Sequence, residues 1–310
     1  MVVKRFQNRV AESRFALPIV AVYGLLVCMA YGLFSQQLWL QFGLLAASAF
    51  LMVELNNANA LIRIYSRMVS CSFLVLALLS CQAFVDVKCG VVQLCFIAFY
   101  LFFFHTYQDK HAVGRIFYAF MMLGIASTMF LQILYFLPIA WILMYTNMLS
   151  GCARTLLASV MGVVVPYMFW GAYGVYTGDV DTVYSHIMEF VTFGELFDYS
   201  HLSVQEIVTA AFVCLLSFTG MIHFRRNNYR DRIRTRMVFE IFTTFALAII
   251  VFIVLQPVHF NYLLSMLVAS TAPMIGHYIA LTKTWITNIS FYVMMLAALL
   301  ITLSNIWMPF

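Results

Sequence analysis

The sequence predicts an all-α protein that crosses a membrane about eleven times, within a range of roughly ten to twelve. Of its 310 residues, 64% are hydrophobic and only 9% are charged, whereas soluble domains carry roughly 25% charged residues. The apolar runs are ~17–24 residues long, as membrane helices require, and they lack the alternation over ~10 residues that marks barrel strands. This composition excludes a water-soluble fold.

The third observation is a basic block, His223 to Arg236, that lies between two of these apolar runs. Because Lys and Arg collect in cytoplasmic loops, the block predicts a cytoplasmic loop that orients every other span. The net charge of +5 is interpreted in the same way, with lipid headgroups as secondary contacts and no role in binding nucleic acid. The block contains one acid, Asp231, and six arginines: Arg225, Arg226, Arg230, Arg232, Arg234 and Arg236.

The first half of the chain begins with a basic amphipathic lead, residues 1–14, which we expect on the cytoplasmic surface. The turn 35–37 and the loop 86–88 are predicted outside, whereas the Asn-rich turn after the second span and the loop 105–115 are predicted inside. The apolar runs between them predict four spans, at about 15–34, 38–55, 68–85 and 90–104.

The middle of the chain is less regular. Two short apolar runs, 116–130 and 133–149, are marked by Gln132 and Pro138. These two runs fit either two membrane crossings or one re-entrant hairpin. The placement of charged residues does not distinguish the two alternatives, because both leave the following loops on the same side of the membrane. A longer span follows at 155–176, with Pro166 as a candidate kink.

The longest predicted outer segment is 177–206, which has no Lys or Arg. Apolar residues interleave with its acids at helical spacing, so we expect an amphipathic helix on the outer membrane interface. The six acids of this segment are Asp179, Asp181, Glu189, Glu195, Asp198 and Glu206.

The last part of the chain predicts four further spans and an outer C-terminus. With these assignments, every one of the 17 Lys and Arg residues except Lys88 lies inside, as the positive-inside rule requires. No composition shift interrupts the chain, so residues 1–310 are interpreted as one transmembrane domain. The four spans are at about 207–222, 237–255, 262–281 and 286–303.

Two ionisable side chains within spans are candidate functional residues. Glu54 ends the second span, where it could also cap the next turn or pair with Arg63 or Arg67. His277 is more central and lies beside Pro273, and broken helices at this depth line sites in transporters. A single histidine hydrogen-bonded to a neighbouring helix is the alternative interpretation.

The outer acids Asp179, Asp181 and Glu189 are the candidate catalytic residues. Carboxylates in such a group can act as a base or hold a divalent cation that bridges a phosphate. The alternative is the solvated face of an interfacial helix. The seven cysteines show no metal-ligand spacing, and no nucleotide, zinc or nucleophile motif is present, so we predict no cofactor and no metal site.

Two resemblances follow from the motifs. The stretches ELNNANALIRIYSR (residues 54–67) and GRIFYAFMMLGIAS…LPIAWILMY…ARTLLASVMGVVVPY (from Gly114, through Pro166) resemble an uncharacterised family of multi-pass inner-membrane proteins of Bacteroidota. This resemblance implies a bacterial inner-membrane location and carries no activity.

The middle of the chain, Gly124 to Gly178, also resembles the scaffold of polytopic glycosyltransferases that use polyprenyl-phosphate sugars. Those enzymes place an acid in the first long outer loop, which here is only Ser35-Gln36-Gln37. The resemblance therefore implies a catalytic apparatus that is reduced or moved to the segment 177–206.

Three classes of function are consistent with these observations. The first is a non-catalytic subunit of a cell-envelope assembly or secretion complex, with other membrane proteins as partners; the lack of catalytic motifs and of soluble domains favours it. The second is a glycosyltransferase that acts on a polyprenyl-phosphate sugar at the outer face. The third is a transporter or lipid flippase, with Glu54 and His277 along the path.

Overall fold

The structure is a computed structural model that describes residues 5–178, 180–191 and 196–307, and its regular elements are all helical. The first half contains α1 (Phe6–Glu12), α2 (Ala16–Ala30), α3 (Trp39–Asn59), α4 (Met68–Ala77), α5 (Cys81–Val85), α6 (Val87–Phe104), α7 (Val113–Ser127), the 3-10 helix η1 (Leu131–Phe136) and α8 (Leu137–Thr146). The second half contains α9 (Ala153–Thr177), α10 (Val180–Met188), α11 (Val204–Asn227), η2 (Asn228–Arg230), α12 (Ile233–Leu255), η3 (Pro257–His259), α13 (Phe260–Leu281) and α14 (Trp285–Trp307).

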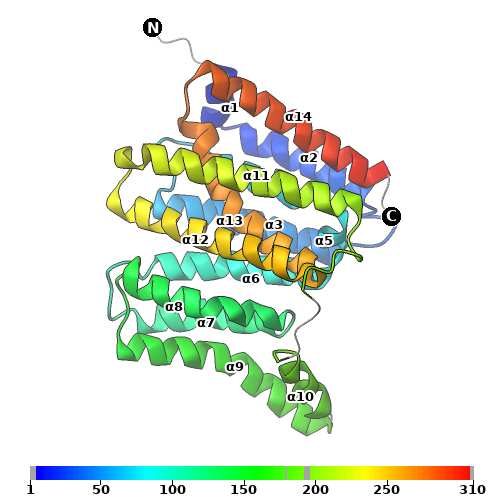
Figure 1. Cartoon of the computed structure of the whole chain (residues 1–310), viewed down its shortest axis with the longest axis vertical. Coiled ribbons are helices and arrows are strands. Elements are labelled where there is room, and N and C mark those ends of the chain that lie inside the picture. Colours follow the sequence, from blue (N-terminus) through cyan, green and yellow to red (C-terminus); the bar gives the residue numbers. More distant parts are fainter. Residues whose placement is uncertain (1–4, 179, 192–195, 308–310) are drawn as a thin grey trace.

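The long helices run side by side between two ends of the molecule (Figure 1). We call one of them the basic end; it holds α1 and the turns around residues 60–67, 105–112, 147–152, 228–232 and 282–284. The other is the acidic end, which holds the turns around 31–38, 78–86, 128–130 and 256–259 together with the described part of 178–203. Loops that the charge pattern assigns to the same side of the membrane therefore lie at the same end of the molecule.

Seven helices are long and apolar enough to cross a membrane, and α1 with α2 forms an eighth candidate that is bent by 91°. The all-helical, multi-pass character predicted from composition is confirmed at this level. The remaining predicted spans fall on shorter apolar helices, at 68–77, 113–127 and 131–146. The seven are α3, α6, α9, α11, α12, α13 and α14, with α11 counted together with η2 and α13 with η3.

The irregular region 116–149 forms a hairpin that runs the full distance between the two ends. At the basic end, the N–H of Gln108, before α7, donates to the carbonyl of Met148, after α8. At the acidic end, the ring of Phe130 stacks on Tyr262 at 4.8 Å between centroids. The irregularity expected at Gln132 is the 3-10 turn η1, and Pro138 occupies the first turn of α8, where its missing N–H costs nothing.

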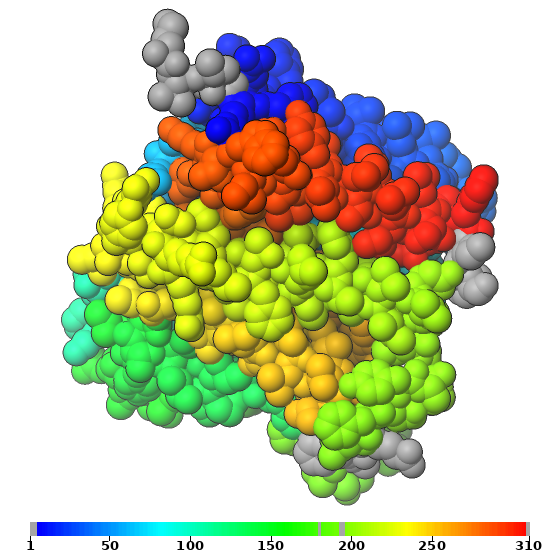
Figure 2. Space-filling view, turned by 45° about the horizontal axis from the view of Figure 1, so that its top comes forward, coloured from blue at the N-terminus to red at the C-terminus, as the bar shows by residue number. Residues whose placement is uncertain are grey.

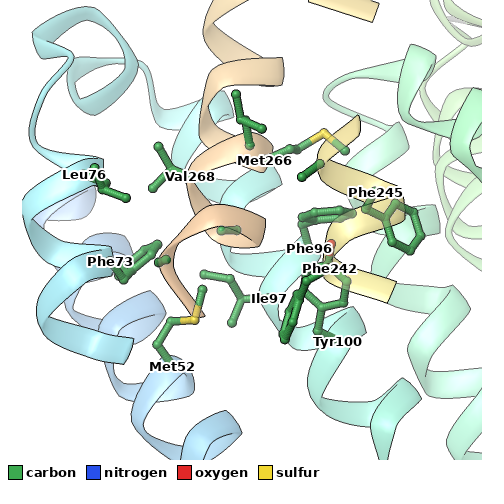
Figure 3. Packing of buried hydrophobic residues seen from close by; sticks show 14 of the residues in the cluster. Met52, Phe73, Leu76, Phe96, Ile97, Tyr100, Phe242, Phe245, Met266 and Val268 are labelled. Carbon is green, nitrogen blue, oxygen red and sulfur yellow. The ribbon is translucent and has the colours of Figure 1, made fainter. Parts of the chain in front are cut away.

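The core is organised around α13, which is buried over its whole apolar length. A helix that is hydrophobic on all sides belongs in the centre of a bundle. Figure 3 shows its Met266 and Val268 between Phe73 on one side and the aromatic cluster of α6 and α12 on the other. In that cluster Tyr100 packs edge-on against Phe242 at 4.9 Å between centroids, a geometry that aromatic pairs prefer.

Two glycines allow α7 and α9 to approach closely. A Cβ on Gly162 would lie 2.5 Å from the carbonyl oxygen of Phe117, and one on Gly124 would lie 2.8 Å from that of Val163. Small residues at such crossings are typical of helix pairs in membranes, where close backbone contact replaces the hydrophobic effect as the driving force.

In the described part of the N-terminal lead, Phe6–Glu12 forms α1, which docks on the end of α13. The side-chain amide of Gln7 donates to the carbonyl of Ile279 and to the hydroxyl of Thr282, both at 2.7 Å. The amide of Asn8 donates to the carbonyl of Thr282 at 2.9 Å. These contacts satisfy carbonyl groups that a helix end leaves without partners.

Among the described residues of 177–206, the amphipathic helix expected in this segment is α10. Gly178, at φ +73°, ends α9, and α10 covers only Val180–Met188. The described residues after Phe197 form turns, in which the Asp198 carboxylate accepts from the Ser200 backbone N–H and hydroxyl. These hydrogen bonds, the side-chain one first, lower the pKa of Asp198.

Candidate functional site: a basic cavity

The six arginines of the basic block have different contacts. Arg234 donates to Asn59 at 2.9 Å and to the carbonyl of Phe104, at the end of α6, at 3.1 Å. Arg236 donates to the backbone oxygen of Asp231 at 3.0 Å. Arg225 borders an open cavity of about 390 Å³ that also includes Glu240, while Arg232 is exposed. Arg226 and Arg230 line a larger cavity.

The single acid of the block, Asp231, is the centre of a buried ionic contact. Its side chain is only 3% exposed, and its carboxylate lies 3.2 Å from Nε2 of His277 and 3.6 Å from Nη1 of Arg63. Arg63 also donates to the backbone oxygen of Arg230 at 3.3 Å. Buried charges require paired and hydrogen-bonded partners, so this contact fixes the basic block against α13 and the turn after α3.

The larger cavity lies at the basic end between α11, α13 and the start of α14, and its volume is about 590 Å³. Four cationic side chains line it, and none of its lining residues in the described part of the chain carries a carboxylate. The hydroxyl groups of Thr219, Thr282, Thr284 and Thr287 complete a polar wall. The four cationic residues are Arg63, Arg226, Arg230 and Lys283.

His223 is a wall residue with an unsatisfied nitrogen. Its Nδ1 accepts from the amide of Asn227 at 3.3 Å, so a neutral ring carries its proton on Nε2. That Nε2 is buried and has no partner within the described structure. Buried polar groups of this kind normally have a protein or water partner, so the Nε2–H of His223 is an unsatisfied donor within the wall of the cavity.

The ring of His277 lies behind His223, with 5.6 Å between the ring centroids. Because Nε2 of His277 faces the carboxylate of Asp231, that nitrogen is the donor and Nδ1 is the acceptor of a neutral ring. Nδ1 is also buried without a partner. The Nε2–H of His223 and the Nδ1 of His277 are therefore a donor and an acceptor that both lack a partner among the described residues.

This combination of side chains suits a phosphate group. Guanidinium groups match the geometry and charge of phosphate oxygens, and lysine adds a point charge. The four threonine hydroxyls already donate to protein oxygens, so the cationic side chains are the donors toward an anion. Basic pockets between membrane helices at the cytoplasmic side are typical binding sites for anionic headgroups.

The two intramembrane candidates, Glu54 and His277, are not brought together. Glu54 is exposed near the basic end of α3, whereas His277 is 1% exposed and bound to Asp231. The proposed partners of Glu54 are engaged elsewhere, since Arg63 contacts Asp231 and Arg67 donates to Asn57 at 3.2 Å. Of the two, only His277 belongs to the polar cluster at the basic end.

The outer catalytic candidates are also separate. Asp179 lies outside the described residues. Asp181 is exposed in the first turn of α10, and Glu189 follows its last turn, 3.6 Å from Nδ1 of His186. Within the described parts of the chain, no group of three or more His, Cys, Asp or Glu side chains has a geometry that could hold a metal ion.

Sequence reasoning did not single out Arg63, His223 or Lys283 as site residues, and it treated Asp231 only as an exception within a basic loop. One signal was present for Asp231: a lone acid among six arginines, in a segment that needs no negative charge for its orientation. No local signal marks the other three, because they come from separate segments that meet only in the folded chain.

Comparison with protein-family models, with curated proteins and with solved structures finds no match to this chain.

Proposed function

We propose that this is a bacterial inner-membrane protein that crosses the bilayer eleven times, with its N-terminus in the cytoplasm and its C-terminus outside. The alternation of helices between the basic and acidic ends supports this topology, and so does the hairpin that runs from one end to the other and back. The positive-inside rule then places the basic end in the cytoplasm.

We further propose that the protein binds a phosphate-bearing anion at this cytoplasmic end. The observation that carries the proposal is the cavity of about 590 Å³ with four cationic side chains and no carboxylate among its described lining residues. A basic loop that served only for orientation would need neither a cavity shared with α13 and α14 nor the unpartnered Nε2 of His223. The proposal favours the transporter and lipid-flippase class over an enzyme that acts at the outer face.

The proposal is tested by binding glycerol 3-phosphate to the purified full-length protein in detergent. Arg226→Gln removes one of the cavity cations, and we expect it to weaken binding roughly tenfold or more, since a hydrogen bond to a charged group contributes about 1.5–3 kcal/mol. Arg232→Gln is the matched control, because Arg232 is exposed in the same loop but lines no described cavity. It should leave the affinity unchanged.

Equal affinities of wild type, Arg226→Gln and Lys283→Gln would overturn the proposal. Equal losses in Arg226→Gln and Arg232→Gln would also overturn it, because the loop would then act only through its total charge. Native mass spectrometry of the same sample tests the alternative that the protein is a non-catalytic subunit of a cell-envelope complex. A stoichiometric protein partner would favour that alternative.

A further inference from the structure

An apolar slot lies beside the basic cavity. Its volume is about 130 Å³, and its walls come from α4, α11, α13 and α14, with one residue each from α1 and α2. It is lined almost entirely by hydrocarbon and aromatic groups, including Leu216, Ile275, Phe291, Met295 and Ala298. In Figure 2, α14 and α11 lie next to each other on one face of the molecule, with the N-terminal helices beyond α14.

The slot and the cavity occupy successive turns of the same three helices. On α11 the slot residue Leu216 is followed one turn later by the cavity residue Thr219. On α14 the cavity residue Thr287 precedes the slot residue Phe291 by one turn. Because residues three or four apart share a helix face, both helices pass from the slot to the cavity along one side.

The third helix that borders both the slot and the cavity is α13. On α13 the slot residue Ile279 is adjacent to the cavity residue Tyr278, and Ile275 lies one turn deeper. The basic cavity is thus at the end of the helices, and the apolar slot lies next to it and extends from there toward the middle of the bundle. A cationic cavity at the end of the helices with an apolar slot next to it matches the two parts of an anionic lipid.

We infer that the ligand of the basic cavity is a lipid, with its phosphate among Arg63, Arg226, Arg230 and Lys283 and its hydrocarbon chain in the slot between α11, α13 and α14. This inference rests on the proposed phosphate site and names its substrate class. A water-soluble phosphate would use the cavity and gain nothing from the slot. A lipid in the cytoplasmic leaflet places its headgroup and its chain at these two depths without leaving the bilayer.

The experiment compares two probes, glycerol 3-phosphate and short-chain phosphatidic acid, with the full-length protein in detergent. Met295→Trp fills the slot from α14, and Met295 is 46% exposed, so the substitution does not disturb a closed core. We expect it to weaken phosphatidic acid about tenfold and to leave glycerol 3-phosphate unchanged, since each buried methylene adds to lipid affinity. Leu296→Trp, on the adjacent face of α14 and 59% exposed, is the matched control.

The outcomes separate the two proposals. If Met295→Trp and Leu296→Trp bind phosphatidic acid equally well, the lipid inference is wrong, and the phosphate site is unaffected. If wild type binds glycerol 3-phosphate as tightly as phosphatidic acid, the ligand is a free phosphate compound. If Arg226→Gln retains full affinity for both probes, the phosphate site itself fails. A selective loss of phosphatidic acid in Met295→Trp, with both probes weakened in Arg226→Gln, supports the inference.

Discussion

The basic and acidic ends of the molecule differ in what their charges contact. At the basic end, Asp231 joins the basic block to α13 and to Arg63, and four cations surround one cavity. At the acidic end, Asp198 contacts Ser200 and His201, and Glu189 contacts His186, all within the described part of 178–203. At the basic end, cations from separate segments thus line one common cavity.

The largest expected difference between the ends is in stability. Asp231→Ala leaves His277 and Arg63 without their buried partner, so we expect the free energy of unfolding to fall by about 3–5 kcal/mol. Asp181→Ala, at an exposed position of α10, should change it by no more than about 0.5 kcal/mol. Thermal unfolding in detergent measures both. Equal effects would show that the two ends do not differ in this way.

A smaller difference is expected for the neutral hydrogen bonds that hold α1 against the end of α13 at the basic end. Gln7→Ala removes the two bonds from α1 to the end of α13, and each is expected to contribute about 0.5–1.5 kcal/mol. Gln36→Ala changes an exposed glutamine in a turn at the acidic end and serves as the control. Chemical unfolding should separate the variants by about 1–3 kcal/mol, and an unchanged Gln7→Ala would mean that α1 is not docked in solution.

The smallest expected effect is a change in the pH dependence of alkylation of the Cys152 thiol, which lies at the basic end. Hydrogen bonds from Thr155 lower the pKa of Cys152, and the thiolate, which is the reactive form, is populated above that pKa. Thr155→Val should therefore move the midpoint of alkylation to higher pH, as read by mass spectrometry of the Cys152 peptide. A midpoint that does not move would remove Thr155 as the cause.

The same thiol reports on orientation. A membrane-impermeant maleimide should label Cys152 in inverted inner-membrane vesicles and leave it unlabelled in intact cells, if the basic end faces the cytoplasm. The reverse pattern would place the cavity outside and overturn the positive-inside assignment of the whole chain.

The sequence alone determined the helical class, the positions of the apolar runs and the separation of the basic and acidic loops, because hydropathy and charge placement are local properties. Each predicted span coincides with a helix or a pair of short helices. The breaks within the shorter spans could not be predicted from the sequence. The break between α4 and α5 and the 3-10 helix η1 depend on contacts with neighbouring helices.

Only the tertiary structure decided which polar residues meet. Arg63 and Arg230 are 167 positions apart and Asp231 and His277 are 46 apart, yet all four border one cluster. Which helices pack together depends on the complementary shapes of their side chains, as at the close contact of Gly162 and in the aromatic cluster around Tyr100. Such contacts between distant segments leave no local pattern in the sequence. The sequence marked His277 as an ionisable residue within a predicted span, but the structure places it near the basic end of α13, against Asp231, rather than at a central depth, and no local signal marked the cavity beside it.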